Sequence, residues 1–138
     1  MEWFERIQSS PALSALAETV RPGGHHALRG AAGSSTSVLA AALARRADRP
    51  VLLVVAHLDE AADAAEELRD LGVPARVFPA MEAAAGDSAG GLETALERLR
   101  ASVPAASGGV TVAPIAALMQ TLPAPARHDR LRLMVEPG

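Results

Sequence analysis

The sequence predicts an α/β domain in which a parallel β-sheet lies between two layers of helices. Three observations carry this prediction. A glycine- and serine-rich turn leads into a helix-like run, an apolar run follows at Val51–Val55, and further short apolar runs alternate with helical patterns. Such alternation is typical of right-handed βαβ units, which build a parallel sheet. A chain of 138 residues, 49% of them hydrophobic, suffices for one such domain.

The composition narrows the classes of function. Cysteine is absent, which excludes disulfides, thiolate metal sites and cysteine nucleophiles. The formal charge is −3 and the aromatic residues are Trp3, Phe4 and Phe78, so we expect neither a basic face nor a stacking platform for nucleic acid. No apolar run approaches the roughly 18 residues that span a bilayer, and the N-terminus lacks a signal-peptide pattern. We therefore expect a soluble, cytoplasmic protein without a membrane partner.

Residues 1–24 are predicted to form two short helices ahead of the α/β part. Ser10 is a suitable N-cap with Pro11 at the first helical position, and apolar residues recur at helical spacing on both sides of it. Pro22 and the two glycines after it end the second helix. The α/β domain is then predicted over residues 25–138. Because the sequence stops directly after a predicted strand, we expect a piece of a longer chain.

Five segments are predicted as strands. The run Val51–Val55 has no polar residue and is expected to be the central strand, covered on both faces. Pro74 places its own segment toward an edge. The last segment alternates apolar residues on one face and needs cover from further chain. The five segments are residues 25–29, 51–55, 73–78, 110–113 and 131–135.

Helices are predicted between these strands. Ser34 or Ser35 can cap the first, and Asp59 can cap the second, which Gly72 closes. Later helices are predicted over Leu92–Leu99 and from Pro114 onward, with a surface loop over residues 79–91. On the second helix the expected inward residues are Leu58, Ala61, Ala62, Ala65 and Leu68, and the expected outward ones are Asp63, Glu66, Glu67, Arg69 and Asp70.

The turn before the first of these helices has the form of a phosphate-binding loop. In the motif G-x-x-x-x-G-K-[ST], backbone N–H groups cradle phosphates, the lysine reaches the outer phosphates and the hydroxyl holds magnesium. Here Thr36 stands in the lysine position, and all thirteen basic residues of the chain are arginine. We therefore expect no bound cofactor, although a sulfate or phosphate could still bind weakly at the helix N-terminus. The vestigial loop comprises Gly30, Gly33, Ser34, Ser35, Thr36 and Ser37, with Gly30 at the first glycine, Ser35 at the second and Ser37 keeping the hydroxyl.

Other polar residues are expected to be structural. Asp59 and Glu60 resemble the acidic pair that holds magnesium in helicases, but three residues separate them from the preceding strand, so helix capping is expected. His25 and His26 are neighbours on a predicted strand and point to opposite faces, so they cannot share a metal ion. His57 and His128 are isolated and are taken as surface residues. No His and Asp arrangement singles out a serine nucleophile, so we predict no catalytic residue and no metal ligand.

Arg45, Arg46 and Arg49 form a cluster at a predicted helix end. They could contact a phosphate backbone or an acidic partner. The favoured interpretation is a solvated face whose charges complement the helix dipole.

Five segments in order resemble the N-terminal region of bacterial transcription-repair coupling factors (the Mfd family). The similarity runs from about Leu13 to the end of the chain, and no single segment is specific by itself. The segments are residues 28–35, 50–55 with the acidic helix after them, 76–82, 91–99 and 109–123.

The resemblance implies a helicase-type domain similar to the first domain of UvrB, with a degenerate phosphate loop and no nucleotide. It further implies a parent that is an ATP-dependent DNA translocase, whose motor domains use ATP and magnesium. Such a parent displaces stalled RNA polymerase and recruits UvrA for nucleotide excision repair, through domains outside these residues. Residues 83–91 depart from the family, which usually carries aromatic and acidic residues there. The alternative is a small stand-alone P-loop-like nucleotide-binding enzyme.

Overall fold

The computed structural model describes residues 2–20, 24–27, 29, 33–47, 49–81, 88–103 and 107–121. No helix among these residues is long and apolar enough to cross a membrane. The elements in chain order are α1 (Glu2–Gln8), α2 (Pro11–Thr19), α3 (Ser35–Ala47), β1 (Val51–Val55), α4 (Leu58–Asp70), β2 (Ala75–Val77), α5 (Ser88–Ala101), β3 (Val110–Pro114) and α6 (Ile115–Leu118).

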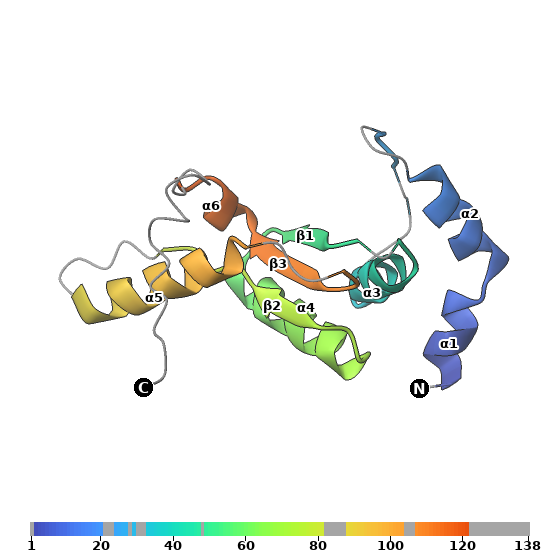
Figure 1. Ribbon diagram of the computed structural model, residues 1–138, viewed down its shortest axis with the longest axis horizontal. Helices are drawn as coiled ribbons and strands as arrows, with labels where there is room; N and C mark the ends of the chain where they lie inside the picture. Colours follow the sequence, from blue (N-terminus) through green and yellow to red (C-terminus); the bar gives the residue numbers. More distant parts are fainter. Residues whose placement is uncertain are drawn as a thin grey trace, which may run out of the picture.

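The three strands form one parallel sheet in the order β1-β3-β2, which confirms the α/β class (Figure 1). Val110 of β3 lies opposite Val51 of β1 and Ala75 of β2. The register continues to Pro114 on one side and to Val112 on the other. Helices α4 and α5, which connect the strands, supply the crossovers that parallel strands require.

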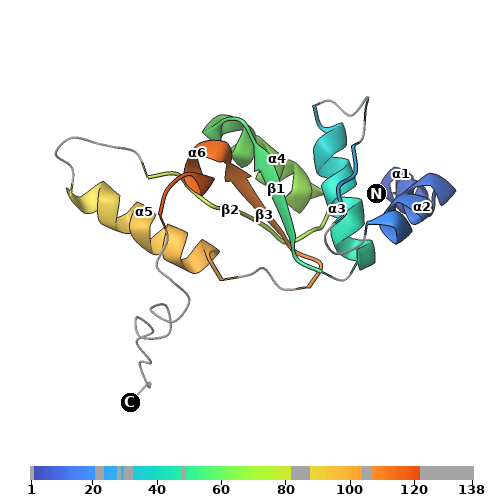
Figure 2. The same cartoon turned by 90° about the horizontal axis from the view of Figure 1, so that it is seen from above.

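The main core lies between one face of the sheet and helices α3 and α4. Val110 and Val112 are fully buried there, together with Leu68 of α4. The helices contribute small side chains, which allow the backbone layers to approach closely. Figure 2 shows α4 along the sheet and α3 beside β1. The buried alanines of this core are Ala40, Ala41, Ala42 and Ala44 on α3 and Ala61, Ala64 and Ala65 on α4.

The opposite face of the sheet is covered over only part of its width in the described chain. A smaller cluster of Phe78, Ala101, Ala113 and Ala117 packs there. Leu52 and Val54 of β1 are 55% and 47% exposed. The strand at Val51–Val55 is thus confirmed, but its predicted central place with cover on both faces is wrong within the described residues. β3 lies in the middle because the helix after β1 carries the chain to β2 on the far side of β3.

The N-terminal helices pack against α3. Ser10 caps α2 as predicted, since its Oγ accepts a hydrogen bond from the Leu13 N–H at 3.2 Å. Phe4 is fully buried in the main core, and Leu13 is nearly so. The guanidinium of Arg45 lies over the Phe4 ring, 5.2 Å from its centre. Helices α1 and α2 therefore share the core of the α/β part.

One predicted strand is absent from the described chain, and another lies outside it. Residues 24–27 and 29 form no strand, so the strand predicted over residues 25–29 is wrong where it can be seen. His25, His26 and Ala27 are exposed, and the segment offers too little apolar surface to join a sheet. Leu28 and Gly30 lie outside the described residues, as does the strand predicted over residues 131–135.

The N-terminus of α4 differs from the prediction in its capping group. Glu60 Oε2 accepts hydrogen bonds from the N–H groups of Ala56 and His57, at 3.0 and 3.3 Å. His57 occupies the N-cap position and Asp59 lies in the first turn, so the prediction of Asp59 as the cap is wrong. A glutamate at the third helical position can reach back and accept a hydrogen bond from the backbone N–H of the cap residue, which explains the difference. On the same helix Leu58 and Ala62 are exposed and Ala64 is buried instead.

Helix α5 starts earlier than predicted and is joined to the rest by arginines. It begins at Ser88, so the loop predicted over residues 79–91 is wrong in its last four positions. Arg98 is 3% exposed, lies 4.6 Å from the Phe78 ring centre and donates to the carbonyls of Pro79 and Ala117. Burial lowers the pKa of this guanidinium. Arg76 of β2 donates to the carbonyls of Arg100 and Val103.

Gly72 is a position where the backbone requires glycine. It follows α4 with φ +70°, and the Val73 N–H bonds to the Leu68 carbonyl across this turn. A Cβ at Gly72 would also lie 2.9 Å from Arg45 Nη2. We expect Gly72→Ala to lower the free energy of unfolding by about 1–2 kcal/mol.

The matched control is Gly91→Ala within α5, where a Cβ would meet nothing within 4 Å. This substitution should be neutral or raise the free energy of unfolding by up to ~1 kcal/mol, because alanine favours helix. Urea unfolding of both variants measures the difference. Equal effects would show that the positive φ of Gly72 is not required.

Candidate functional site at the start of α3

The turn before α3 brings part of the predicted phosphate loop together. Gly33 has φ +56°, a conformation that glycine adopts without strain. The Thr36 N–H bonds to the Gly33 carbonyl at 3.1 Å, and the Val38 N–H to the Ser34 carbonyl at 3.1 Å. Helix α3 thus begins at Ser35 with the side chains of Ser34, Thr36 and Ser37 near its first turn. Gly30, the first glycine of the motif, lies outside the described residues.

A carboxylate of the protein itself lies at this turn. Ser34 Oγ donates a hydrogen bond of 2.5 Å to Glu67 Oε1, which belongs to the second half of α4. Hydrogen bonds from the Ser34 and Ser37 side chains hold the pKa of Glu67 below its ordinary value. Ser37 is only 3% exposed. Since the N-terminus of a helix carries partial positive charge, this is a favourable place for an anion. We call the cluster of Ser34, Ser37 and Glu67 the Glu67 latch.

The residues of the Glu67 latch line two cavities. The larger one, of about 450 Å³, lies between the loop, the C-terminal end of β1 and α4. The smaller one, of about 290 Å³, is also lined by Trp3, Phe4, Val38 and Leu71. None of the described residues that line the larger cavity is basic. Its charged lining residues are Glu60, Asp63 and Glu67.

This arrangement is unfavourable for phosphate. A phosphate site combines helix N–H groups with a cation that balances the outer charges. Here the cavity in front of the helix is acidic, and Thr36 replaces the lysine. The turn is suited to a neutral or cationic group, or to the Glu67 carboxylate that it already binds.

The sequence missed Glu67 because helical periodicity placed it on the outer face of α4. It is partly exposed, as expected, yet it contacts residues 30 and 33 positions away in the chain. No local pattern connects these positions. Ser35 is exposed, and the structure brings Ser34, Thr36 and Ser37 together without a histidine among the residues that line either cavity.

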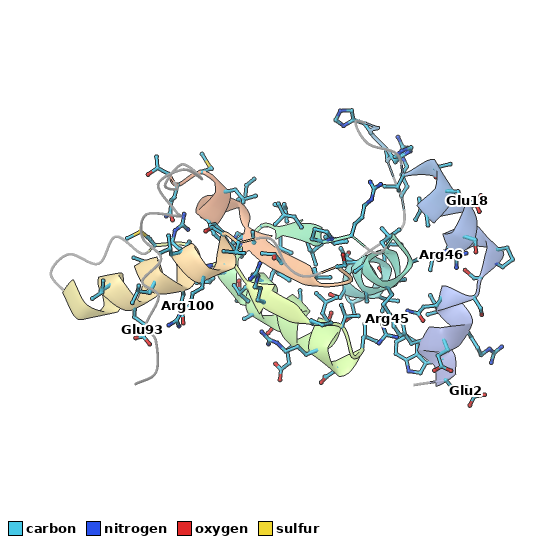
Figure 3. The ribbon with its side chains drawn as sticks, in the orientation of Figure 1. Glu2, Glu18, Arg45, Arg46, Glu93 and Arg100 are labelled. Atoms are coloured by element: carbon cyan, nitrogen blue, oxygen red, sulfur yellow. The ribbon has the colours of Figure 1, made fainter. Side chains whose placement is uncertain are left out.

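Two residues of the arginine cluster, Arg45 and Arg46, are engaged within the protein, and Arg49 is exposed. Arg45 Nη2 donates to the carbonyls of Leu71 and Gly72, at 2.9 and 3.0 Å, and thereby satisfies groups at the C-terminal end of α4. Arg46 Nη1 donates to the Gln8 carbonyl at 3.2 Å. Figure 3 shows Arg45 and Arg46 on α3, on the side where α1 and α2 lie. The solvated-face interpretation is therefore incomplete, since both arginines join elements.

Asp59 and the histidines do not converge on the candidate site. Asp59 does not line either cavity beside the loop. His25 and His26 are exposed, His57 is the N-cap of α4, and His128 lies outside the described residues. In the part of the chain that the structure describes, no three His, Asp or Glu side chains are grouped so that they could hold a metal ion.

No family model, curated protein or solved structure matches this chain.

The lowered pKa of Glu67 has a consequence for acid stability. A carboxylate whose pKa is lower in the folded than in the unfolded state stabilises the fold above the unfolded pKa, and this contribution is lost as the pH falls through the folded pKa. We expect Glu67→Gln to lower the free energy of unfolding at pH 7 by about 1 kcal/mol. The difference from wild type should shrink as the pH falls below the ordinary glutamate range.

Urea unfolding between pH 7 and pH 3 measures this difference, with Glu66→Gln as the matched control on the exposed side of α4. Glu66→Gln should follow the wild-type curve more closely. A pH-independent effect of Glu67→Gln would mean that the charge of Glu67 makes no net contribution.

Proposed function

We propose that this chain is a noncatalytic α/β support domain and forms the N-terminal, UvrB-like part of a transcription-repair coupling factor. The observation that carries the noncatalytic assignment is the Glu67 carboxylate at the first turn of α3. A nucleotide would bring further negative charge to a turn where a carboxylate already accepts the hydroxyl hydrogen bonds. The loop then serves to connect α3 to α4.

The groups that phosphoryl transfer requires support the same proposal. Such chemistry needs a cation at the outer phosphates and a carboxylate that holds magnesium. Thr36 occupies the first position, and Ala56 follows β1 where an aspartate would be needed. The acidic residues at the larger cavity lie on α4, and Glu60 is engaged with backbone N–H groups.

The family resemblance extends the proposal to a parent protein. In the parent, ATP and magnesium would be used by motor domains elsewhere in the chain, which would move along DNA and displace stalled RNA polymerase. UvrA would be recruited by a separate domain for nucleotide excision repair. The present domain would then supply shape and connection without chemistry of its own.

The second candidate function is a small P-loop-like nucleotide-binding enzyme. One observation favours it: the 450 Å³ cavity lies beyond the C-terminal end of a parallel strand, where α/β domains commonly bind ligands. The acidic lining weighs against a nucleotide there. Binding experiments separate the two candidates.

We expect calorimetric titration of the chain with ATP and magnesium to show no binding at micromolar concentrations. Thr36→Lys should not create it, because the new ammonium would lie beside Asp63 and Glu67, which line the same cavity as Thr36. Micromolar binding by the wild type that Ser37→Ala removes would contradict the noncatalytic proposal and favour the enzyme.

The support role predicts a division of labour in UvrA recruitment. Residues 1–138 alone should fail to retain purified UvrA in a pull-down, whereas a longer chain that includes the following domain should retain it. The control is the longer chain with Arg98→Ala, a change confined to the support domain. If residues 1–138 captured UvrA as well as the longer chain did, the support assignment would be wrong.

A further inference from the structure

The outer edge of β1 is open in the described chain. β1 pairs with β3 alone, and the Val51 N–H bonds to the Gly109 carbonyl on that side. Because backbone groups alternate along a strand, the N–H and C=O groups of Leu52 and Val54 point to the opposite edge. The strand consists of 5 apolar residues and carries none of the charges, prolines or bulges that discourage further pairing. This edge is therefore suited to accept another strand.

The exposed side chains of β1 lie on a defined face of the sheet. Val54 lies opposite Ala113 of β3, which belongs to the smaller cluster with Ala101 of α5 and Ala117 of α6. Paired residues of neighbouring strands share a face of the sheet. The exposed side chains of Leu52 and Val54 therefore continue the face on which α5 and α6 pack, at a place that no described residue covers.

The order of the crossovers predicts which side of the sheet a further strand joins. Parallel strands are connected by right-handed crossovers in nearly all proteins. Right-handed connections move in one direction over one face of a sheet and in the opposite direction over the other face. Here α4 carries the chain from β1 to β2 over the face of the main core, and α5 carries it back to β3 over the face of the smaller cluster.

Helix α6 follows β3 directly and packs on the second of these faces through Ala117. A further parallel strand reached over this face therefore belongs on the β1 side of β3. Since β1 already occupies the place beside β3, the vacant position is the outer edge of β1. The connection to that position passes over the exposed side chains of β1.

Residues 131–135 have the sequence that this position requires. They lie outside the described residues, and they read Leu-Arg-Leu-Met-Val, with leucine, leucine and valine at alternate positions and no glycine or proline. Residues 115–130 separate them from β3, which exceeds the dozen residues that a parallel crossover needs. Upstream chain does not take the place where it is described, since residues 24–27 and 29 form no strand.

We infer that residues 131–135 form a fourth strand, which pairs in parallel with the outer edge of β1, and that the chain leading to it covers Leu52 and Val54. β1 then has strand neighbours on both sides. The chain closes its own open edge and does not leave it to another protein. This inference concerns the sheet alone and is independent of the proposed function.

Amide hydrogen exchange of the full chain, measured for each residue by NMR, tests the pairing. The N–H groups of Leu52 and Val54 should exchange roughly 100-fold or more slowly than in an unfolded chain, because the fourth strand supplies their acceptors. Leu53 and Val55 are the internal reference, since their N–H groups face β3 and are protected in either case.

The double variant Leu133→Pro, Met134→Pro should remove the protection of Leu52 and Val54 and retain that of Leu53. Two adjacent prolines are needed because one of the two N–H groups faces β1 in any register. The matched control is Leu133→Val, Met134→Ile, which keeps strand-forming residues and should behave as wild type.

Cysteine cross-linking gives a second measurement that still applies if the proline variant does not fold. The chain has no cysteine, so a pair can be introduced without background. Leu52→Cys is combined in turn with a cysteine substitution at each position from 131 to 135. Parallel pairing brings one of these positions within disulfide distance of residue 52, so a cross-link within one chain is expected.

Fast exchange of Leu52 and Val54 in wild type, or the absence of every intrachain cross-link, overturns the inference. Protection that survives the two prolines in a folded variant also overturns it, since another segment would then occupy the edge. Cross-links between chains, with protection that rises with protein concentration, would assign the edge to a second copy of the protein and contradict the inference as well.

Discussion

The close approach of α4 to the sheet is the constraint on which the rest of the structure depends. Val110 and Val112 are fully buried beneath this helix, and Ala61 and Ala65 are buried on the helix face opposite them. A larger side chain at either alanine would push the helix away and leave poorly packed space around the strand. The position of α4 then determines where Glu60 and Glu67 lie.

Arginine side chains connect helices and strands at places where the small, aliphatic core does not. Arg45 ties α3 to the end of α4, Arg98 ties α5 to the segment after β2 and to α6, and Arg76 ties β2 to the end of α5. In each case a guanidinium donates to backbone carbonyls. Its five donors can satisfy two or more acceptors at once, which suits the open ends of helices. The hydrogen bonds to backbone carbonyls explain how the guanidinium of Arg98 can be so deeply buried.

The sequence determined the elements better than it determined their arrangement. Val51–Val55, the strand predicted over residues 110–113 and the Ser10 cap follow from local composition, and the structure confirms them as strand, strand and cap. Pro114, which was predicted to begin the next helix, is instead the last residue of β3 and the N-cap of α6. The place of β1 in the sheet could not be read from its apolar run. An apolar strand indicates burial of its residues in the complete fold, but not which neighbours are supplied by a given stretch of chain.

In the candidate site, too, the sequence predicted the local features but missed the contacts between helices. The motif predicted Ser34, Thr36 and Ser37 at a helix start because loop chemistry is local, and the structure places them there. Glu67 was assigned to the outer face because periodicity describes one helix at a time. Its contact with α3 depends on how the two helices pack. The backbone partners of Arg45 and Arg46 were missed for the same reason, since they lie in the turn after α4 and in α1.

The central claim is that the turn before α3 is occupied by the protein's own carboxylate. The most direct measurement is the titration of the Glu67 side-chain carbon by NMR in the folded chain, with the double variant Ser34→Ala, Ser37→Ala as the comparison. The account predicts a pKa of Glu67 below the ordinary glutamate range in wild type, because both hydroxyls stabilise the ionised form. It predicts a return toward that range in the double variant. An ordinary pKa of Glu67 in wild type, unchanged by loss of the two hydroxyls, would contradict it.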